Sequence, residues 1–210
     1  MTDSLRVTNV TYMNSEPVHQ SATVTVDSPY ELARWRAFFQ WVLYIPHGIM
    51  VAAMGNLSIA VAVLHWLVVL FTGRVNKDLY DINAMILRYE TRTNLYLFGF
   101  SDRYPRFAFS MGESDDGAYP PVGVELPAAP ESVSRVKVFN VILAIPHYIW
   151  IGLVGIAAMV VLVIAWFAVI FTGAWPSGMR DFIVRFSGYY SRVWAYVMMV
   201  DNKYPSFSLS

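Results

Sequence analysis

The sequence contains no cysteine and has no net excess of either charge. Without cysteine the chain can form no disulfide, no thiolate metal site and no cysteine nucleophile. Its 15 acidic and 15 basic side chains cancel, so no overall positive field favours nucleic acid as a partner. The sequence also lacks a glycine-rich phosphate loop, a nucleophile elbow and a His-Glu-x-x-His pattern. We therefore expect a protein that is not an enzyme and has no catalytic residues.

Charged residues are also missing from two long stretches. Residues 37–73 and 138–179 contain no Asp, Glu, Lys or Arg, over 37 and 42 residues respectively. About 20 apolar residues span a bilayer, so each run exceeds the length of one crossing. The first 30 residues are polar and lack the basic-then-apolar pattern of a signal peptide. The sequence predicts a membrane protein whose N-terminus stays in the cytoplasm.

What the chain does contain is an internal repeat. Residues 31–110, moved by 100 positions, align with residues 131–210 without a gap. The shared residues include Ile-Pro-His, Phe-Thr-Gly, Tyr-Pro and a tyrosine at 89 and 189. A fixed repeat defines the structural unit, which here is a membrane module present twice. We divide the chain into a polar N-terminal β segment, a first module with its closing strand, a polar linker with a β-strand, and a second module with its closing strand: 1–30, 31–110, 111–130 and 131–210.

Five short stretches alternate in the manner of β-strands and are bounded by turn residues. They are residues 6–12, 22–26, 107–111, 122–126 and 206–209. Two-stranded pieces are marginal alone, so we expect one small sheet on one side of the membrane. Each module must then cross an even number of times, and two is the smallest such number. The predicted fold is a mainly α-helical membrane protein: a tandem, parallel repeat of a two-crossing helical module with a small cytoplasmic sheet.

Two arrangements of the crossings fit this pattern. In the first, residues 31–44 form an interfacial helix, a long helix begins at Pro46, and the chain returns as residues 79–100. In the second, each apolar run is a hairpin that turns near Gly55 or its counterpart, and the following helix lies on the surface. A turn left in hydrocarbon strands backbone groups without partners, so the first arrangement is favoured.

Lys and Arg are distributed unevenly in the first arrangement. The sheet side carries eight of them: Arg6, Arg34, Arg36, Arg103, Arg106, Arg135, Lys137 and Lys203. The opposite turns carry Arg74, Lys77 and Arg180. Because positive residues stay inside, we expect a multi-pass protein with both termini cytoplasmic.

Several of these motifs resemble a known family. Ile-Pro-His-Tyr at 145–148, Phe-Thr-Gly at 171–173, Asp181-Phe182 and the closing Tyr-Pro-x-Phe resemble an uncharacterised bacterial membrane family, domain of unknown function 4389. The resemblance covers both modules, about 160 of the 210 residues, as two tandem copies. The first copy departs from it at Gly48 and at Asp81-Ile82. The resemblance implies a bacterial cytoplasmic (inner) membrane location and carries no activity.

His47 and His147 are the first candidate site residues. They occupy equivalent places in the two modules, so a pseudo-twofold axis could bring them together. Two facing imidazoles can bind haem iron or copper, which is the alternative to our expectation of no cofactor and no metal. No third ligand repeats at helical spacing. The favoured interpretation is a histidine at a helix start that bonds a lipid headgroup or a carbonyl freed by proline.

Charged residues in the two returning helices form a second set, polar and either intramembrane or interfacial: Asp81, Arg92, Asp181, Arg185 and Arg192. Asp and Arg eleven residues apart share a helix face, and Arg185 follows Asp181 at the spacing of an ion pair. Ionisable groups at membrane depth are candidate functional residues. An ion-paired seam or headgroup binding is favoured over an anion or proton pathway between the modules.

The leading functional hypothesis is an integral membrane protein that acts as an accessory, assembly or stabilising subunit of a larger membrane complex. Its partners would be the lipid bilayer, other membrane-protein subunits or a second copy of itself, and no nucleic acid. One alternative is a small transporter or channel that works as an oligomer. Another is a membrane-shaping hairpin protein, which follows from the second arrangement.

Overall fold

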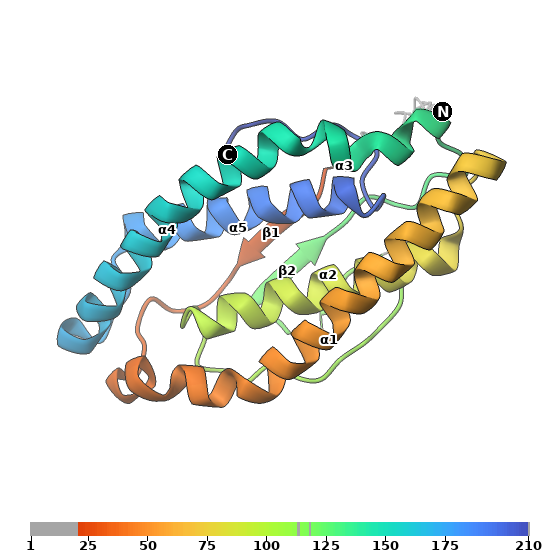
Figure 1. Ribbon diagram of the computed structural model, residues 1–210. Helices are drawn as coiled ribbons and strands as arrows, with labels where there is room; N and C mark the ends of the chain where they lie inside the picture. Colours follow the sequence, from red (N-terminus) through yellow and green to blue (C-terminus); the bar gives the residue numbers. More distant parts are fainter. Residues whose placement is uncertain (1–20, 113, 118, 210) are drawn as a thin grey trace, which may run out of the picture.

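The computed structural model describes residues 21–112, 114–117 and 119–209 (Figure 1). The first half contains β1 (Thr23–Val26), α1 (Arg34–Thr72) and α2 (Lys77–Leu97). The second half contains β2 (Val122–Glu125), the 3₁₀ helix η1 (Arg135–Phe139), α3 (Asn140–Leu143), α4 (Ile145–Thr172) and α5 (Ser177–Val197). Each half therefore has a strand, a long apolar helix and a shorter helix in the same order.

A left-handed glycine ends each long helix. Gly73 and Gly173 have φ angles of 70° and 77°, a conformation that glycine adopts without a Cβ clash. The predicted turn and returning helix are confirmed by this glycine and by α2. The alternative turn near Gly55 is wrong, because α1 is continuous there, as is α4 at the equivalent position.

The prolines of the repeat behave differently in the two modules. α4 begins at Ile145 with Pro146 in its first turn, where the missing N–H is not needed. α1 instead continues through Pro46 from Arg34. The predicted helix start at proline is thus confirmed in the second module and wrong in the first.

The elements form three layers. α1 and α4 make the outer layer, α2 and α5 the middle layer, and the two strands the third layer (Figure 1). α1 packs on α2 and α4 packs on α5. Among the described elements, the strands contact α2 and α5 and neither outer helix. The middle layer is therefore covered on both faces.

A pseudo-twofold axis passes through these layers. β1 and β2 pair antiparallel with Val24 opposite Val124, and Thr91 Oγ1 lies 3.1 Å from Ser191 Oγ. Both pairs are separated by 100 residues, the offset of the sequence repeat. An axis that relates two adjacent antiparallel strands is perpendicular to their sheet. It therefore runs from the sheet, between α2 and α5, to the outer layer.

The two modules are consequently antiparallel. Leu32 N–H, just before α1, donates to the Gly173 carbonyl at 2.8 Å. At the other end of the molecule, Val133 N–H donates to the Gly73 carbonyl at 3.2 Å. In the predicted parallel arrangement, Leu32 and Gly173 would lie on opposite sides of a membrane, and so would Val133 and Gly73. That arrangement is wrong.

The sheet is smaller than predicted and lies beside the helices. Strands at 22–26 and 122–126 are confirmed, 6–12 lies outside the described residues, and 107–111 and 206–209 form no strand. Arg88, in the middle of α2, donates from Nε to the Val124 carbonyl at 3.4 Å. Because the strands pack at the middle of the helices, the sheet does not lie beyond one helix end, and an even number of crossings no longer follows.

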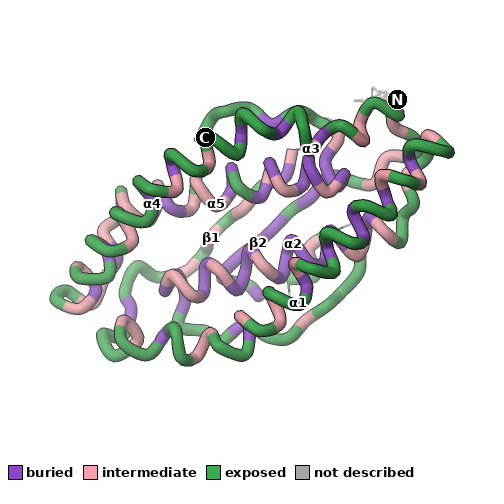
Figure 2. Tube along the Cα trace, in the orientation of Figure 1, coloured by how far each residue is buried: buried purple, intermediate pink, exposed green. Residues whose placement is uncertain are grey.

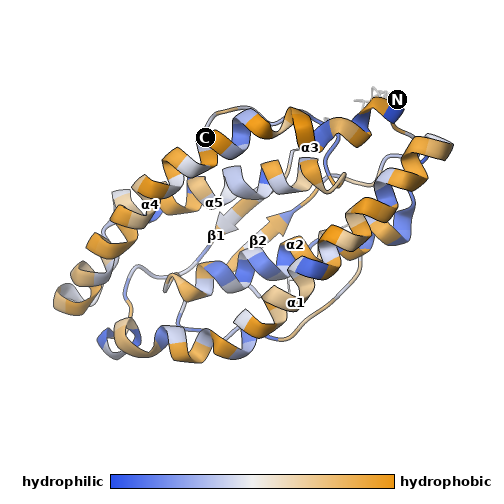
Figure 3. Ribbon diagram, in the orientation of Figure 1, coloured by the Kyte–Doolittle hydropathy of each residue, from blue (hydrophilic) through white to orange (hydrophobic). Residues whose placement is uncertain are grey.

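Apolar surface is concentrated on the outer layer. The segments Arg34–Thr72 and Arg135–Thr172 are both long and apolar enough to cross a membrane. α1 and α4 are largely exposed in Figure 2 and largely hydrophobic in Figure 3. Phe71 and Ile156 expose 75% and 67% of their surface. Among the described residues, α2 in contrast holds the largest share of the buried polar and charged side chains, five of 15.

Candidate functional site

His47 lies in a cage built within the first module. Its imidazole is fully buried, and Nδ1 lies 2.7 Å from the Tyr89 hydroxyl on α2. Phe107 stacks on the ring at a centroid distance of 4.5 Å, and Tyr104 packs beside it at 4.8 Å. The Tyr-Pro-x-Phe segment after α2 therefore folds back onto α1, which explains why residues 107–111 do not join the sheet.

His147 has the same surroundings in the second module. Nδ1 lies 2.6 Å from the Tyr189 hydroxyl, and the imidazole is fully buried. Phe207 stacks on it at 4.1 Å, and Tyr204 packs at 4.9 Å. The repeated His, Tyr and Tyr-Pro-x-Phe residues of the sequence are thus one structural unit that occurs twice.

The two histidines do not share a site. Each histidine is enclosed by residues of its own module. Its tyrosine partner lies on α2 for His47 and on α5 for His147, and the pseudo-twofold axis passes between the two cages. The alternative in which the axis brings the two imidazoles together is not found, because the rings that contact each histidine come from its own repeat. In the described part of the chain, no group of three His, Cys, Asp or Glu side chains is placed to hold a metal ion.

A second repeated contact closes the end of each helix pair. Gln40 Nε2 donates to the Tyr96 carbonyl at 2.6 Å, and Asn140 Nδ2 donates to the Tyr196 carbonyl at 3.0 Å. These carbonyls belong to the last turns of α2 and α5, where they also accept the backbone N–H of Gly99 at 2.9 Å and of Met199 at 3.3 Å. The amides thus tie the first turns of α1, and α3 just before α4, to the ends of α2 and α5 respectively.

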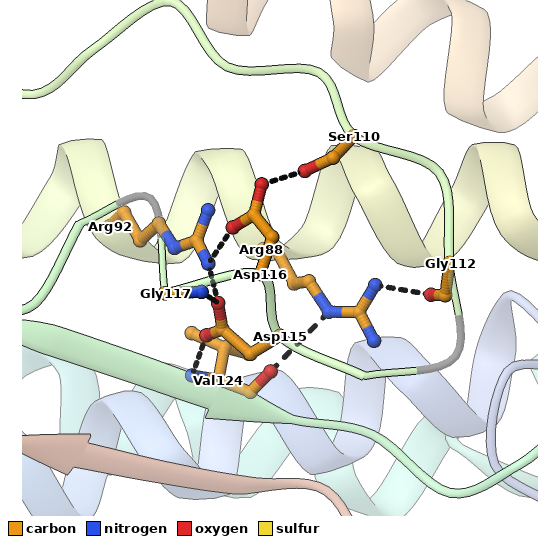
Figure 4. Close-up of polar contacts among 8 residues, drawn as sticks. All are labelled: Arg88, Arg92, Ser110, Gly112, Asp115, Asp116, Gly117 and Val124. Carbon is orange, nitrogen blue, oxygen red and sulfur yellow. Dashed lines mark hydrogen bonds and ion pairs between the residues drawn. The ribbon is translucent and has the colours of Figure 1, made fainter.

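Arg92 lies in a polar cluster that binds the linker to α2 (Figure 4). Its guanidinium forms ion pairs with Asp115 and, at 3.3 Å, with Asp116. The side chains of Arg92 and Asp115 expose only 6% and 5% of their surface. Asp115 also accepts hydrogen bonds from the backbone N–H of Gly117 at 3.0 Å and of Val124 at 2.7 Å. We call this cluster the linker latch.

Arg88 extends the linker latch one turn along α2. Its Nη1 atom donates to the Gly112 carbonyl at 2.7 Å, in addition to the bond from Nε to the Val124 carbonyl. Two buried arginines therefore hold the acidic loop and β2 against the middle layer (Figure 4). Acidic residues beside glycine are typical of exposed loops, so the sequence gives no sign that the Asp115 side chain is buried.

The other predicted charged residues have separate partners. Asp81 pairs with Lys77 at 2.9 Å rather than sharing contacts with Arg92. Arg192 donates from Nη2 to the Ser208 carbonyl at 2.7 Å. Asp181 and Arg185 are both exposed and form no ion pair with each other, which corrects the predicted pair. The structure therefore does not assemble these five residues into one site.

One charged residue that the sequence interpretation left aside stands out. Glu90 of α2 faces a groove of about 390 Å³ lined by α1, α2 and α5. Its carboxylate makes no hydrogen bond or ion pair with any described group, and burial raises its pKa to about 7. Its counterpart in the repeat is Tyr190, so comparing the two copies could have found it as an unmatched charge.

Taken together, the fold and its contacts define a two-module helical protein with an exposed apolar layer, a polar middle layer and a latched linker. The chain belongs to the family described as domain of unknown function DUF4389, whose model matches residues 34–109 and 137–208. Both modules are matched, so the resemblance seen in the sequence and its two tandem copies are confirmed. No curated protein and no solved structure matches the chain.

Proposed function

We propose that this chain is a non-catalytic membrane protein whose outer layer is embedded in one leaflet of the bilayer. α1 and α4 lie in the membrane plane, while α2, α5 and the sheet face the aqueous side. Its role is that of an accessory, assembly or stabilising subunit of a larger membrane complex. The location is the bacterial cytoplasmic membrane, with both termini on the cytoplasmic side. This orientation replaces the crossing helices expected from the sequence.

The path of the segment 98–134, which contains the linker and β2, carries this proposal. The segment starts beside Trp175, whose Nε1 donates to the Gly99 carbonyl at 3.0 Å. It ends at the opposite end of α2, where Val75 N–H donates to the Glu131 carbonyl at 3.3 Å. Apart from β2, this segment contains no helix or strand among its described residues, and it runs the full length of α2 (Figure 1).

This path is costly if the helices cross the membrane. The linker would then pass through hydrocarbon beside α2, with exposed charges such as Arg103 and Arg106. Irregular backbone exposed to lipid leaves polar groups unpaired at several kcal/mol each. With the helices in the membrane plane, the linker and the sheet stay in water. Of the surface that the structure describes, the apolar faces of α1 and α4 are then the large areas in contact with acyl chains.

Residues at the ends of the outer layer support the same orientation. Arg34 and Arg135 are exposed beside the C-terminal glycines of α4 and α1. Basic residues at this level attract anionic headgroups by about 1 kcal/mol each. Trp35 and Trp41 expose 50% and 61% of their surface near the start of α1 and suit the headgroup region.

The orientation can be tested by cysteine labelling, since the chain has no native cysteine. Three single variants, Thr25→Cys, Lys77→Cys and Ser177→Cys, are placed in sealed vesicles and treated with a membrane-impermeant maleimide. The in-plane orientation predicts that all three react from the same side. Parallel two-crossing modules would place positions 77 and 177 opposite to 25. Crossing helices in the antiparallel fold would separate 77 from 177, so each topology has its own pattern.

The proposed role as a subunit is tested by purification in mild detergent at native expression levels, followed by native mass measurement. We expect a co-purifying membrane protein at constant stoichiometry. Variants of the polar face, such as Glu125→Arg on β2, should weaken that association without changing membrane binding. A stable monomer that brings no other protein would contradict the proposed role.

A second candidate function is membrane shaping, favoured by the position of both apolar helices on one face. Insertion of α1 and α4 into a single leaflet expands that leaflet relative to the other. Purified protein added to large vesicles should then produce smaller or tubular vesicles, as seen by electron microscopy. Unchanged vesicles at full binding would exclude this role. The structure gives the transporter hypothesis no support from Arg92 and Arg192, which motivated it, because Arg92 pairs with the linker and Arg192 bonds the closing segment of its own module.

A further inference from the structure

The groove beside Glu90 is the most unusual polar feature of the molecule. It lies at mid-length of the fold, between α1 on one side and the α2–α5 pair on the other. Glu90 is the one charged side chain among the described residues that line it. We refer to it as the central groove, defined by Gly55, Glu90, Tyr190 and Trp194.

When it is ionised, a carboxylate in this place is stabilised by a positively charged partner. Glu90 Oε1 would lie 3.5 Å from a Cβ at Gly55, so the carboxylate packs against the surface of α1. The groups that interact with it electrostatically are the hydroxyls of Tyr44 and Tyr190, and neither is a cation. Half-buried charge without a counter-ion is unfavourable. A ligand that brings a positive charge would remove this cost.

The walls of the central groove suit an organic cation. Tyr190 and Trp194 meet edge to face at a centroid distance of 6.0 Å, next to Glu90 in the groove lining. Aromatic faces beside a carboxylate are the usual environment for ammonium groups. Asn94 accepts a hydrogen bond from the Tyr44 hydroxyl through Oδ1 at 3.0 Å, which leaves its amide N–H groups as donors for a phosphate.

We propose that the central groove binds the zwitterionic headgroup of a membrane phospholipid, with its ammonium group at Glu90. The remaining lining is largely apolar, with Val51, Ile59 and Leu87 placed to contact acyl chains. Figure 1 shows α1 and α4 diverging at mid-length with α2 and α5 between them. A phospholipid bound in the central groove would have its headgroup at the middle layer and its acyl chains directed toward the hydrocarbon, which is the normal orientation in a leaflet.

The proposal rests on the membrane contact of the outer layer, and the two can fail separately. Cysteine labelling tests the contact in vesicles. Lipid retention, measured in neutral detergent micelles, tests the groove whatever the orientation in a bilayer. Protein is incubated with equal amounts of phosphatidylethanolamine and phosphatidylglycerol of the same chain length, and bound lipid is counted by native mass spectrometry.

We expect one phosphatidylethanolamine per chain and a preference over phosphatidylglycerol. Glu90→Gln should lower retention about tenfold or more, because a charge-assisted contact is lost. The control Glu125→Gln, on the exposed edge of β2, should leave retention unchanged. Glu90→Gln removes no existing contact of the carboxylate, so it should fold as the natural chain does, as checked by thermal unfolding.

A second pair of variants tests the shape of the central groove. Gly55→Leu places a side chain against Glu90 and should block lipid binding, whereas the matched Gly152→Leu has open space around its Cβ and should not. Retention should also rise about tenfold from pH 6 to pH 8 as the carboxyl group ionises. Equal retention of both lipids, or unchanged retention in Glu90→Gln, would overturn the proposal. Displacement of the lipid by free ethanolamine alone would overturn the assignment to a lipid.

Discussion

Loss of one hydroxyl should destabilise each histidine cage by a measurable amount. In Tyr89→Phe, the ring stays in place while His47 loses the 2.7 Å contact at Nδ1. Nε2 of His47 is already buried without a hydrogen bond of normal geometry, although the Pro105 carbonyl interacts with the ring. A buried polar atom left without a partner costs about 1–3 kcal/mol, and we expect this loss in the free energy of unfolding. Tyr189→Phe should cost the same, because the His147 contact is 2.6 Å and equally buried.

The assay is denaturant unfolding in neutral micelles, followed by circular dichroism. The two cages share no residue, so the double variant should lose about the sum of the single losses, within 0.5 kcal/mol. Tyr44→Phe is the control: its hydroxyl bonds the partly exposed Asn94, and its removal should cost less than about 1 kcal/mol. Single losses below about 0.5 kcal/mol would refute the idea that these hydrogen bonds hold the modules together. A strongly non-additive double variant would refute the separation of the cages.

Three further predictions concern other buried polar groups. His65 is fully buried with neither ring nitrogen bonded, so His65→Leu should raise the free energy of unfolding by about 1–3 kcal/mol, measured in the same assay. Asp115→Asn leaves the Arg92 guanidinium without its buried partner and should cost about 3–5 kcal/mol, whereas Asp116→Asn, at a position one third exposed, should cost less than about 1 kcal/mol. The pKa of Glu90 is raised to about 7 from 4.5, so between these values the folded chain binds more protons than the unfolded chain and stability falls as pH rises. This pKa shift corresponds to at most about 3 kcal/mol of unfolding free energy, at 1.36 kcal/mol per pKa unit. The natural chain should therefore be more stable at pH 4.5 than at pH 8 by up to this amount. In Glu90→Gln this contribution to the difference between the two unfolding curves should disappear.

The elements of the fold follow from local patterns, and their arrangement does not. The charge-free runs, the Gly73 turn and two of the strands could be located because helix length, left-handed glycine and alternation are local properties. The antiparallel relation of the modules depends on contacts such as Leu32 with Gly173, which join residues far apart in sequence. A sequence repeat shows what the structural unit is and how many copies the chain contains. It does not show whether the copies run in the same direction.

The candidate residues divide in a similar way. His47 and His147 were found because they repeat, yet their partners Phe107 and Phe207 were assigned to strands, since phenylalanine next to serine alternates as a strand does. The role of Asp115 could not be predicted, because acidic residues beside glycine usually lie in exposed loops. Its burial depends on Arg92, which comes from a helix that precedes it by more than 20 residues.

The two copies also show which contacts the duplication requires. Contacts within a module, such as the histidine cages, need the same residues in both copies. On the axis, a residue contacts the equivalent residue of the other copy, so the two side chains need only fit each other. Val24 with Val124 and Thr91 with Ser191 are such pairs.

Contacts that exist once fall outside both groups. Arg88 holds the linker, whereas its counterpart Gly188 lets β1 approach α5, with Val24 4.0 Å from a Cβ placed there. Glu90 likewise faces Tyr190 across the axis. Because symmetry does not require these residues, the packing of the duplicated modules does not account for them. The latched linker and the central groove are therefore the places where the duplicated fold departs from a simple symmetric pair, and where a function beyond packing is best sought.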